Sequence, residues 1–164
     1  MKNKNNKEPE SRKIAASNRR AGAKYEIIET LEAGLVLTGP EVKSLRAGKA
    51  NLQDGFARIE GEEAHLWNVH ISPYTQGSLH VVQEPTRKRK LLLHQSEIKR
   101  WMGRTTTKGL TIVPLEIYFN KRGFAKVKLA LAKGKKGPDR RDDLRKKTVQ
   151  RELQRGYAGK FKVK

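Results

Sequence analysis

The sequence predicts a mainly β fold: a small antiparallel barrel or sandwich with short helices. Apolar and more polar side chains alternate over residues 113–119 and again over 125–131, and the turn residues 120–123 separate the two runs. Alternation with a period of two is typical of half-buried strands, so these runs predict a hairpin. The other apolar runs are also short and bounded by turn residues, which favours a barrel or sandwich over βαβ units.

Further strands are expected at residues 25–30 and 34–38, as a first pair, and at 56–60 and 64–71, joined by a tight loop at 61–63. In the 113–131 hairpin, the period of two places Lys126 and Lys128 together on the face opposite the apolar one. Pro114 has no N–H to donate to a ladder, so its strand is expected to lie at a sheet edge or to carry a bulge.

Two short helices are expected between the strands. Residues 40–47 begin with a proline in the first turn and an acidic residue near the helix N-terminus, and Gly48 follows where a C-cap belongs. Residues 95–102 place Ile98, Trp101 and Met102 on one face, and Gly103 is expected to end that helix.

The net charge of +20 predicts a polyanionic partner, and nucleic acid is the leading candidate. The polar start of the chain and the lack of a long apolar run predict a cytoplasmic protein without membrane contact. The chain has no cysteine, which excludes disulfides and cysteine-ligated zinc modules. The histidines are well separated, and no nucleotide-binding or catalytic motif is present, so no metal, cofactor or enzymatic activity is expected.

The chain is expected to have three parts, and residues 1–24 and 133–164 are more basic than residues 25–132. Residues 1–17 are expected to be a basic N-terminal extension, 18–132 the β-barrel body, and 133–164 a basic tail. The tail has 13 basic and 4 acidic residues and few large apolar side chains. It is therefore expected to be disordered in isolation and to become helical where RNA neutralises its charge.

A run of cations on the body predicts a phosphate-binding surface. Arg87, Lys88, Arg89 and Lys90 lead directly into three leucines, 91–93, which are expected to enter the core and so fix the cations on a rigid element. Together with Lys126 and Lys128 they are expected to contact RNA phosphates. The aromatic side chains not assigned to the core, and so available to stack on bases, are Phe124, Tyr118, Tyr74 and Tyr157.

Several longer motifs closely resemble the small protein B family, the bacterial partners of tmRNA. They are NRRA at 18–21, YEI at 25–27, EAGL at 32–35, EVKSLRAGKAN at 41–51, RKLLL at 89–93, KVK at 126–128 and AKGKK at 132–136. The resemblance covers nearly all of residues 18–143. It implies an oligonucleotide-binding β-barrel with flanking helices, which agrees with the strand pattern above.

The resemblance also implies partners and site residues. The expected partners are the tRNA-like domain of tmRNA and the stalled 70S ribosome, including its small-subunit rRNA, and the protein is expected to act as a monomer. Family positions for tmRNA contact fall on Asn18, Glu32, Arg46, Leu92 and Lys126, and the full predicted tmRNA site adds Arg19, Arg87, Arg89, Lys90 and Lys128.

The tail is expected to enter the empty mRNA channel near the decoding centre, through Lys133, Gly134, Lys135, Lys136, Asp139, Arg140 and Arg141. The family's usual His-Asp-Lys-Arg signature reads Pro138-Asp139-Arg140-Arg141 here. Arginine for lysine keeps the charge, whereas proline for histidine removes a ring that could stack on a ribosomal base.

Two other functions compete with this adaptor. A structural ribosomal protein with a tail threaded through rRNA would be present on every washed ribosome rather than enriched on stalled ones. An RNA-processing enzyme would show metal- or base-dependent turnover, for which the sequence offers no constellation.

Overall fold

The computed structural model describes residues 12–74 and 83–135, together with Val149. The chain divides after Gly134 into two units, residues 1–134 and 135–164. Only Lys135 and Val149 of the second unit belong to the described residues. The predicted disorder and conditional helix of the tail lie outside them.

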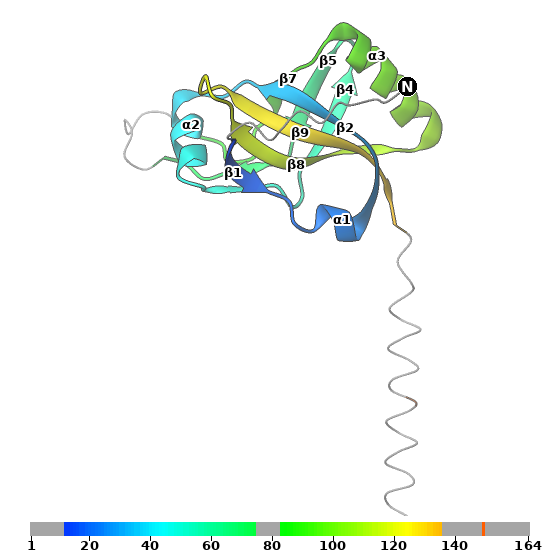
Figure 1. Cartoon of the computed structure of the whole chain (residues 1–164), viewed down its shortest axis with the longest axis horizontal. Coiled ribbons are helices and arrows are strands. Elements are labelled where there is room, and N and C mark those ends of the chain that lie inside the picture. Colours follow the sequence, from blue (N-terminus) through cyan, green and yellow to red (C-terminus); the bar gives the residue numbers. More distant parts are fainter. Residues whose placement is uncertain (1–11, 75–82, 136–148, 150–164) are drawn as a thin grey trace, which may run out of the picture. The chain divides into compact units, whose positions relative to one another are not determined.

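The first unit is a closed antiparallel sheet (Figure 1). Its strands follow the order β1 (Lys13–Ser17), β8 (Thr111–Phe119), β4 (Phe56–Glu60), β5 (Glu63–Trp67), β7 (Arg89–Leu92), β2 (Tyr25–Leu35) and β9 (Ala125–Gly134). Because β9 also pairs with β8, the sheet closes into a barrel. This confirms the predicted mainly β fold, while the name oligonucleotide-binding fold stays a prediction.

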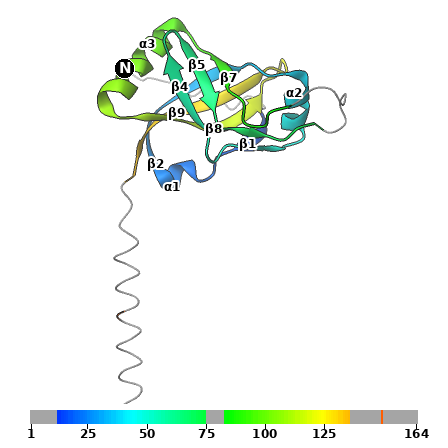
Figure 2. The ribbon, with the colours of Figure 1, turned by 180° about the vertical axis from the view of Figure 1, so that it is seen from behind.

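Smaller elements flank the barrel. They are α1 (Ala21–Lys24), α2 (Gly39–Arg46), α3 (Gln95–Lys108) and a two-stranded sheet of β3 (Ala50–Asn51) and β6 (His70–Ile71). Seen from behind, β4, β5 and β7 form the wall opposite β8 and β9 (Figure 2).

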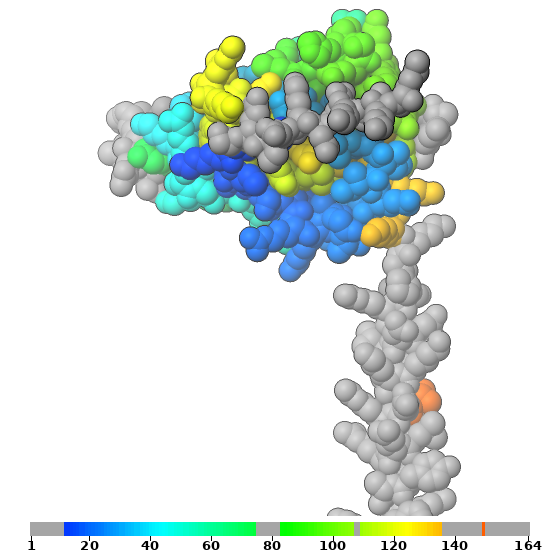
Figure 3. Space-filling view, in the orientation of Figure 1, coloured from blue at the N-terminus to red at the C-terminus, as the bar shows by residue number. Residues whose placement is uncertain are grey.

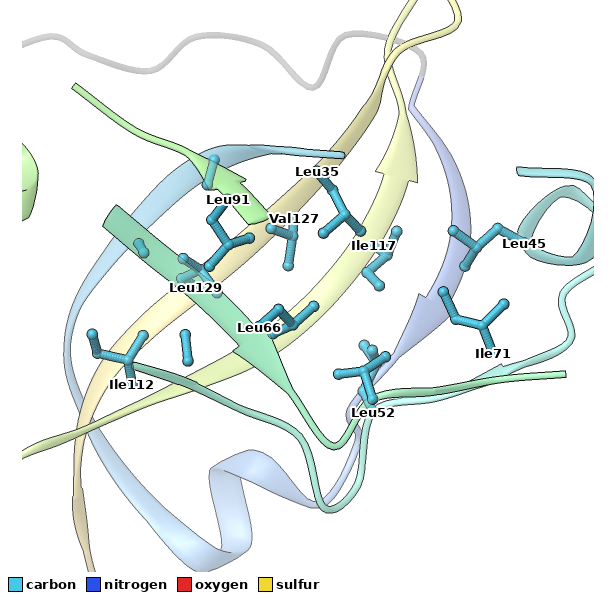
Figure 4. Packing of buried hydrophobic residues seen from close by; sticks show 14 of the residues in the cluster. Leu35, Leu45, Leu52, Leu66, Ile71, Leu91, Ile112, Ile117, Val127 and Leu129 are labelled. Carbon is cyan, nitrogen blue, oxygen red and sulfur yellow. The ribbon is translucent and has the colours of Figure 1, made fainter. Parts of the chain in front are cut away.

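The barrel interior is filled by the inward residues of the alternating strands. Leu66, Ile117, Val127 and Leu129 come from three different strands, are at most 1% exposed and converge in the centre (Figure 4). The predicted hairpin is confirmed, since β8 and β9 pair along their length and residues 120–123 form the turn. The register shifts between Pro114 and Glu116, which confirms the predicted bulge at that proline.

Two strand predictions were wrong. Residues 25–30 and 34–38 do not form a pair, because 25–35 are one continuous strand, β2, which pairs with β9 and at its end with β7. Residues 64–71 are not one strand, because Asn68 has a positive φ of 59° and breaks the run between β5 and β6.

The first helix is confirmed and the second is longer than predicted. In α2 the Thr38 side chain and Glu41 form a capping box, and Gly48 has a φ of 71°. Gly103 does not end α3. The helix continues to Lys108 and ends at Gly109, whose φ is 59°. Beyond Gly103, the Arg104 guanidinium pairs with Glu29 of β2 and so holds this part of the helix on the barrel.

The barrel extends beyond the predicted boundaries at both ends. Strand β1 pairs with β8 from Lys13 to Ser17, so these residues belong to the sheet and not to an N-terminal extension. Strand β9 continues to Gly134, which pairs with Tyr25 of β2. Both boundaries are decided by pairing with residues far away in the sequence, Ser17 with Glu116 and Gly134 with Tyr25, and a local charge count does not detect such partners.

Candidate nucleic-acid interface

A row of residues crosses the outer face of four neighbouring strands. In register, Leu92 of β7 lies opposite Gly34 of β2, Gly34 opposite Lys126 of β9, and Lys126 opposite Tyr118 of β8. The flanking residues Leu91 and Val127 are buried, so the row faces outward, as the alternation predicts for Lys126. Lys128 occupies the next outward position of β9 and lies opposite Glu32.

Glu32 is held in place beside this row. The hydroxyl of Tyr118 donates a hydrogen bond to one carboxylate oxygen of Glu32, and the ammonium of Lys126 lies 3.8 Å from the other. The Tyr118 side chain is only 2% exposed, and the Arg12 guanidinium stands 5.0 Å from its ring centre. The prediction that Tyr118 is free to stack on a base was therefore wrong, because the ring is covered and its hydroxyl positions Glu32.

A pocket of about 520 Å³ opens beside the row, and we call it the turn pocket. It is lined by Glu32, Gly34, Leu35, Leu92, Leu93, His94, Glu97, Asn120, Arg122, Phe124, Ala125 and Lys126. Gly34 allows the Leu92 side chain to pack closely against β2, since a Cβ at this position would stand 3.1 Å from the Cβ of Leu92. The pocket brings together three residues predicted for tmRNA contact, namely Glu32, Leu92 and Lys126.

The turn between β8 and β9 forms the rim of this pocket and projects from the surface, in yellow, beside α2 (Figure 3). Arg46, at the end of α2, lies close to this turn: its guanidinium is 5.4 Å from the Phe119 ring centre and would meet a Cβ placed on Gly123 at 3.8 Å. Among the described residues, Arg46, Lys121, Arg122 and Lys128 form no ion pair. This end of the barrel therefore carries Arg46, Lys121 and Arg122 as exposed cations, each without an ion-pair partner in the described part of the chain.

The cations predicted at residues 87–90 are paired with carboxylates, and the prediction that Arg89 contacts tmRNA was wrong. Its side chain is 0% exposed and donates to Glu41 Oε1 at 2.8 Å and to the carbonyl oxygens of Val69, Arg87 and Pro85. Arg89 therefore cannot reach a phosphate. It ties α2 and the segment preceding β7 to the barrel.

The other three cations of this run also have carboxylate partners. Arg87 binds Glu41 at 2.6 Å, Lys88 binds Glu60 at 2.5 Å and Lys90 binds Glu63 at 2.5 Å. Hydrogen bonding to Glu41 raises the pKa of Arg87 above its ordinary value. A cation held tightly by a carboxylate attracts phosphate weakly. Arg46 and Lys128 form no ion pair among the described residues, and Lys126 lies 3.8 Å from its partner Glu32, so the structure supports these three as the phosphate-facing set more strongly than residues 87–90.

The three leucines after the cation run do not all enter the core, as had been expected. Leu91 is 2% exposed and packs inside, whereas Leu92 is 56% exposed and stands in the outer row. Alternation along β7 is the reason, because neighbouring residues of a strand point to opposite faces. The outward direction of Leu92 agrees with the role that the family resemblance implies for it.

Asn18 and Arg19 lie apart from the turn pocket. The Asn18 amide donates to the carbonyl oxygens of Leu52 and Pro114, each at 3.3 Å, and its own oxygen is buried without a hydrogen-bond partner among the described residues. Asn18 thus joins the end of β1 to the barrel, and its contact with tmRNA stays a prediction. Arg19 is exposed and precedes α1, and β2 begins directly after this helix at Tyr25. Tyr25 pairs with Gly134, at the opposite end of β9 from Lys126.

The start of the predicted tail belongs to the barrel. Lys133 and Gly134 are the last residues of β9 and lie opposite Glu26 and Tyr25. Lys135 is exposed, and the other predicted tail residues, Lys136, Asp139, Arg140 and Arg141, lie outside the described residues, as do the Pro138 substitution and Tyr157.

Residues 12–74 and 83–135 contain no group of three or more histidine, aspartate or glutamate side chains placed to hold a metal ion. His65 is near two carboxylates, at 3.8 Å from Glu60 and 3.5 Å from Glu63, and these glutamates are themselves paired with lysines. No helix within this described part of the chain is long and apolar enough to cross a membrane.

Sequence reasoning missed two features of this surface, the hydrogen bond between Tyr118 and Glu32 and the hollow above Gly34. Both depend on the register of four strands. The only advance signal was the alternation that puts Tyr118 and Lys126 on one face if the hairpin pairs as predicted.

The closed antiparallel barrel and its cationic outer face define a small basic β-barrel protein of the kind that binds nucleic acid. The family model described as SmpB protein matches residues 15–159. The chain therefore belongs to the SmpB family.

Curated relatives agree with this assignment. The chain is 57% identical to the SsrA-binding protein of Desulforudis audaxviator over 154 residues, which are 94% of this chain and 98% of the relative. It is 54% identical to the SsrA-binding protein of Enterococcus faecalis over 143 residues, 87% of this chain and 92% of the relative.

A solved chain is similar in fold as well. It comes from the structure "tmRNA-SmpB: a journey to the center of the bacterial ribosome", is 54% identical and superposes with a TM-score of 0.63. The match covers 84% of this chain and 96% of the solved one.

Proposed function

We propose that this chain is a non-catalytic RNA-binding adaptor. It binds the tRNA-like domain of tmRNA and brings it to ribosomes stalled on messages without a stop codon, so that the nascent peptide is tagged. Membership of the SmpB family supports this function, as do relatives named SsrA-binding proteins and a similar chain solved in a tmRNA-SmpB structure that concerns the bacterial ribosome.

The single observation that supports the tmRNA site best is the outer row of β7, β2, β9 and β8. It places Leu92, Lys126 and Lys128 beside Glu32 on one face, next to the unneutralised Arg46 and Arg122. Cations fixed on strands meet phosphates without losing much conformational entropy, and the carboxylate can accept hydrogen bonds from bases or 2′-hydroxyls.

The tail takes a second role in this proposal. Strand β9 ends at Gly134, and residues 135–164 carry 12 basic and 4 acidic residues, a net charge of +8. We assign to this segment the contact with small-subunit rRNA in the empty mRNA channel. The barrel then selects the tmRNA, and the tail reports that the channel holds no message.

Comparison of the full chain with residues 1–134 tests this division. Removing residues 135–164 keeps every barrel strand. We expect the shortened protein to retain most of its tmRNA affinity at physiological salt, measured by filter binding with competitor tRNA. It should fail to support tagging in a reconstituted translation reaction on a message without a stop codon.

The reciprocal control is Lys126→Ala in the full chain. This variant should bind tmRNA more weakly, and tagging should return when enough protein is added to saturate the tmRNA. An excess of the shortened protein, residues 1–134, should not restore tagging. Equal loss of tmRNA binding and tagging in both variants would refute the two-ended adaptor.

A further inference from the structure

A cluster of ionisable side chains lies on the outer face of β4 and β5 and at the start of β7, and we call it the His65 cluster. Its members are Glu60, Glu63, His65, Lys88 and Lys90, and none of these lines the turn pocket. In the register of the sheet, His65 lies between Arg58 of β4 and Lys90 of β7. The alternating neighbours Ala64 and Leu66 are buried, so His65 points outward.

Both ring nitrogens of His65 lie near carboxylate oxygens. Nδ1 is 3.8 Å from Glu60 Oε2, and Nε2 is 3.5 Å from Glu63 Oε2. The His65 side chain is 14% exposed, and its Nδ1 is buried without a hydrogen-bond partner among the described residues. A neutral imidazole has one donor and one acceptor nitrogen, so in either tautomer one carboxylate lies near a nitrogen lone pair. Only the protonated ring has a donor on both nitrogens.

The same two carboxylates hold the lysines of the cluster. Lys88 Nζ is 2.5 Å from Glu60 Oε2, the oxygen that is also nearest to His65, and Lys90 Nζ is 2.5 Å from Glu63 Oε1. The hydrogen bonds from these lysines lower the pKa of Glu60 and of Glu63, so both carboxylates are ionised at neutral pH. Each lysine is therefore paired with a carboxylate that His65 can also use.

The charges on the elements beside His65 balance one another. These elements carry Arg58 and Glu60 on β4, Glu62 in the hairpin turn, Glu63 on β5, and Lys88 and Lys90 at the start of β7. With His65 neutral, three cations and three carboxylates give a net charge of zero, and protonation of His65 raises it to +1. The Lys88 ammonium also lies 4.9 Å from the Trp67 ring centre, so the ring helps to hold this cation at the surface when Glu60 turns to His65.

We propose that His65 is a pH-dependent switch that converts this face from a neutral surface into one that binds polyanions. The imidazolium competes with Lys88 for Glu60, and it competes with Lys90 for Glu63. Protonation therefore adds one charge and loosens the pairing of two lysines at the same time. Histidine is the side chain whose charge changes between pH 5 and 8, so the switch works in the mildly acidic range. It requires only charge and does not depend on the proposed function.

Binding of fluorescently labelled heparin to the full chain tests the switch, because heparin is a polyanion without bases or a folded shape. Affinity is measured by fluorescence anisotropy at pH 8 and pH 6 at the same ionic strength. The wild type should gain more affinity on acidification than His65→Gln, which stays neutral, by roughly 1.5- to 5-fold for each released lysine. The slope of log K against log salt should also steepen by about one for each lysine.

Two further variants separate the cluster from the other histidines of the chain. The matched control is His70→Gln, because His70 is exposed on β6 and forms no ion pair within residues 12–74 and 83–135. It should keep the pH response that His65→Gln loses. The double variant Glu60→Gln with Glu63→Gln frees both lysines at every pH. It should bind heparin more tightly than the wild type at pH 8 and should lose the additional pH response.

NMR spectra of the histidine rings in the wild-type chain record directly whether His65 changes its protonation between pH 8 and pH 5.5. The switch is overturned if His65 keeps one protonation state over this range. It is also overturned if heparin binding responds to pH equally in the wild type and in His65→Gln. Neither result affects the proposed function, which fails only if the wild type does not bind tmRNA in preference to tRNA.

Discussion

Replacing Glu41 by glutamine is expected to destabilise the barrel strongly. Glu41 is 6% exposed and binds both Arg87 and Arg89, and the Arg89 side chain is 0% exposed. Glutamine keeps the size of the side chain but removes its charge. The variant therefore leaves a buried guanidinium without its compensating carboxylate, which is more costly than losing a surface ion pair.

The magnitude follows from the environment of Glu41. Burial alone would raise its pKa, but the hydrogen bonds from Arg87 and Thr38 and the charge of Arg89 lower it from 4.5 to about 2. This difference corresponds to about 3 kcal/mol of stability at neutral pH. It agrees with the roughly 3–5 kcal/mol lost when one partner of a buried ion pair is removed. For a domain of this size, the melting temperature should fall by roughly 10 °C.

Urea unfolding followed by tryptophan fluorescence measures this effect in the full chain, because Trp67 lies on the barrel strand β5 and Trp101 of α3 is buried in the core. The pKa of Glu41 is lower in the folded state, so its stabilisation is complete above pH 4.5 and is lost as the pH falls toward 2. The difference between wild type and Glu41→Gln should therefore be largest at pH 7 and shrink on acidification.

The matched control is Glu60→Gln, because Glu60 binds Lys88 at the exposed surface and lies 3.8 Å from His65. It should change the stability far less than Glu41→Gln does. A difference for Glu41→Gln that equals the control, or that does not depend on pH, would refute the reasoning about the buried pair.

Three further predictions concern the site and the barrel. Lys126→Ala should weaken tmRNA binding and lower the slope of log K against log salt by about one, and an unchanged slope would show that it touches no phosphate. Gly55→Ala should lower the free energy of unfolding by about 1–3 kcal/mol, because its Cβ would stand 2.5 Å from Val69 Cγ2. Gly103→Ala, with open space around it in α3, should instead be neutral or stabilising, and urea titration of both variants checks this contrast. Gly123→Ala should destabilise the turn by about 1–2 kcal/mol, because a residue with a Cβ disfavours the φ of 82° at this position. It should also weaken tmRNA binding by displacing Phe124, and unchanged binding would contradict the role of the turn.

Local patterns in the sequence predicted much of the barrel. The alternation over residues 113–131 placed the hairpin, its turn and the bulge at Pro114 correctly, because each depends on neighbouring residues. The capping residues of α2 were equally local. The end of α3 was missed, since a glycine stops a helix only where tertiary contacts do not carry it further, and here Arg104 pairs with Glu29.

The candidate site was predicted less well, and the error at residues 87–90 has a clear physical cause. A cation that a carboxylate of the folded chain holds at short distance attracts phosphate weakly. Arg89 and Glu41 are 48 residues apart in the sequence and 2.8 Å apart in the structure, so the sequence around Arg89 does not reveal its partner.

The sequence by itself determined that this chain is basic and mainly β, placed Lys126 and Lys128 on one face, and carried the motifs that resemble its family. Only the tertiary structure decided which cations remain unneutralised and where the hollow beside Phe124 lies. Alternation and charge are properties of neighbouring residues. Ion pairs and pockets arise from strand register, which joins residues far apart in the chain.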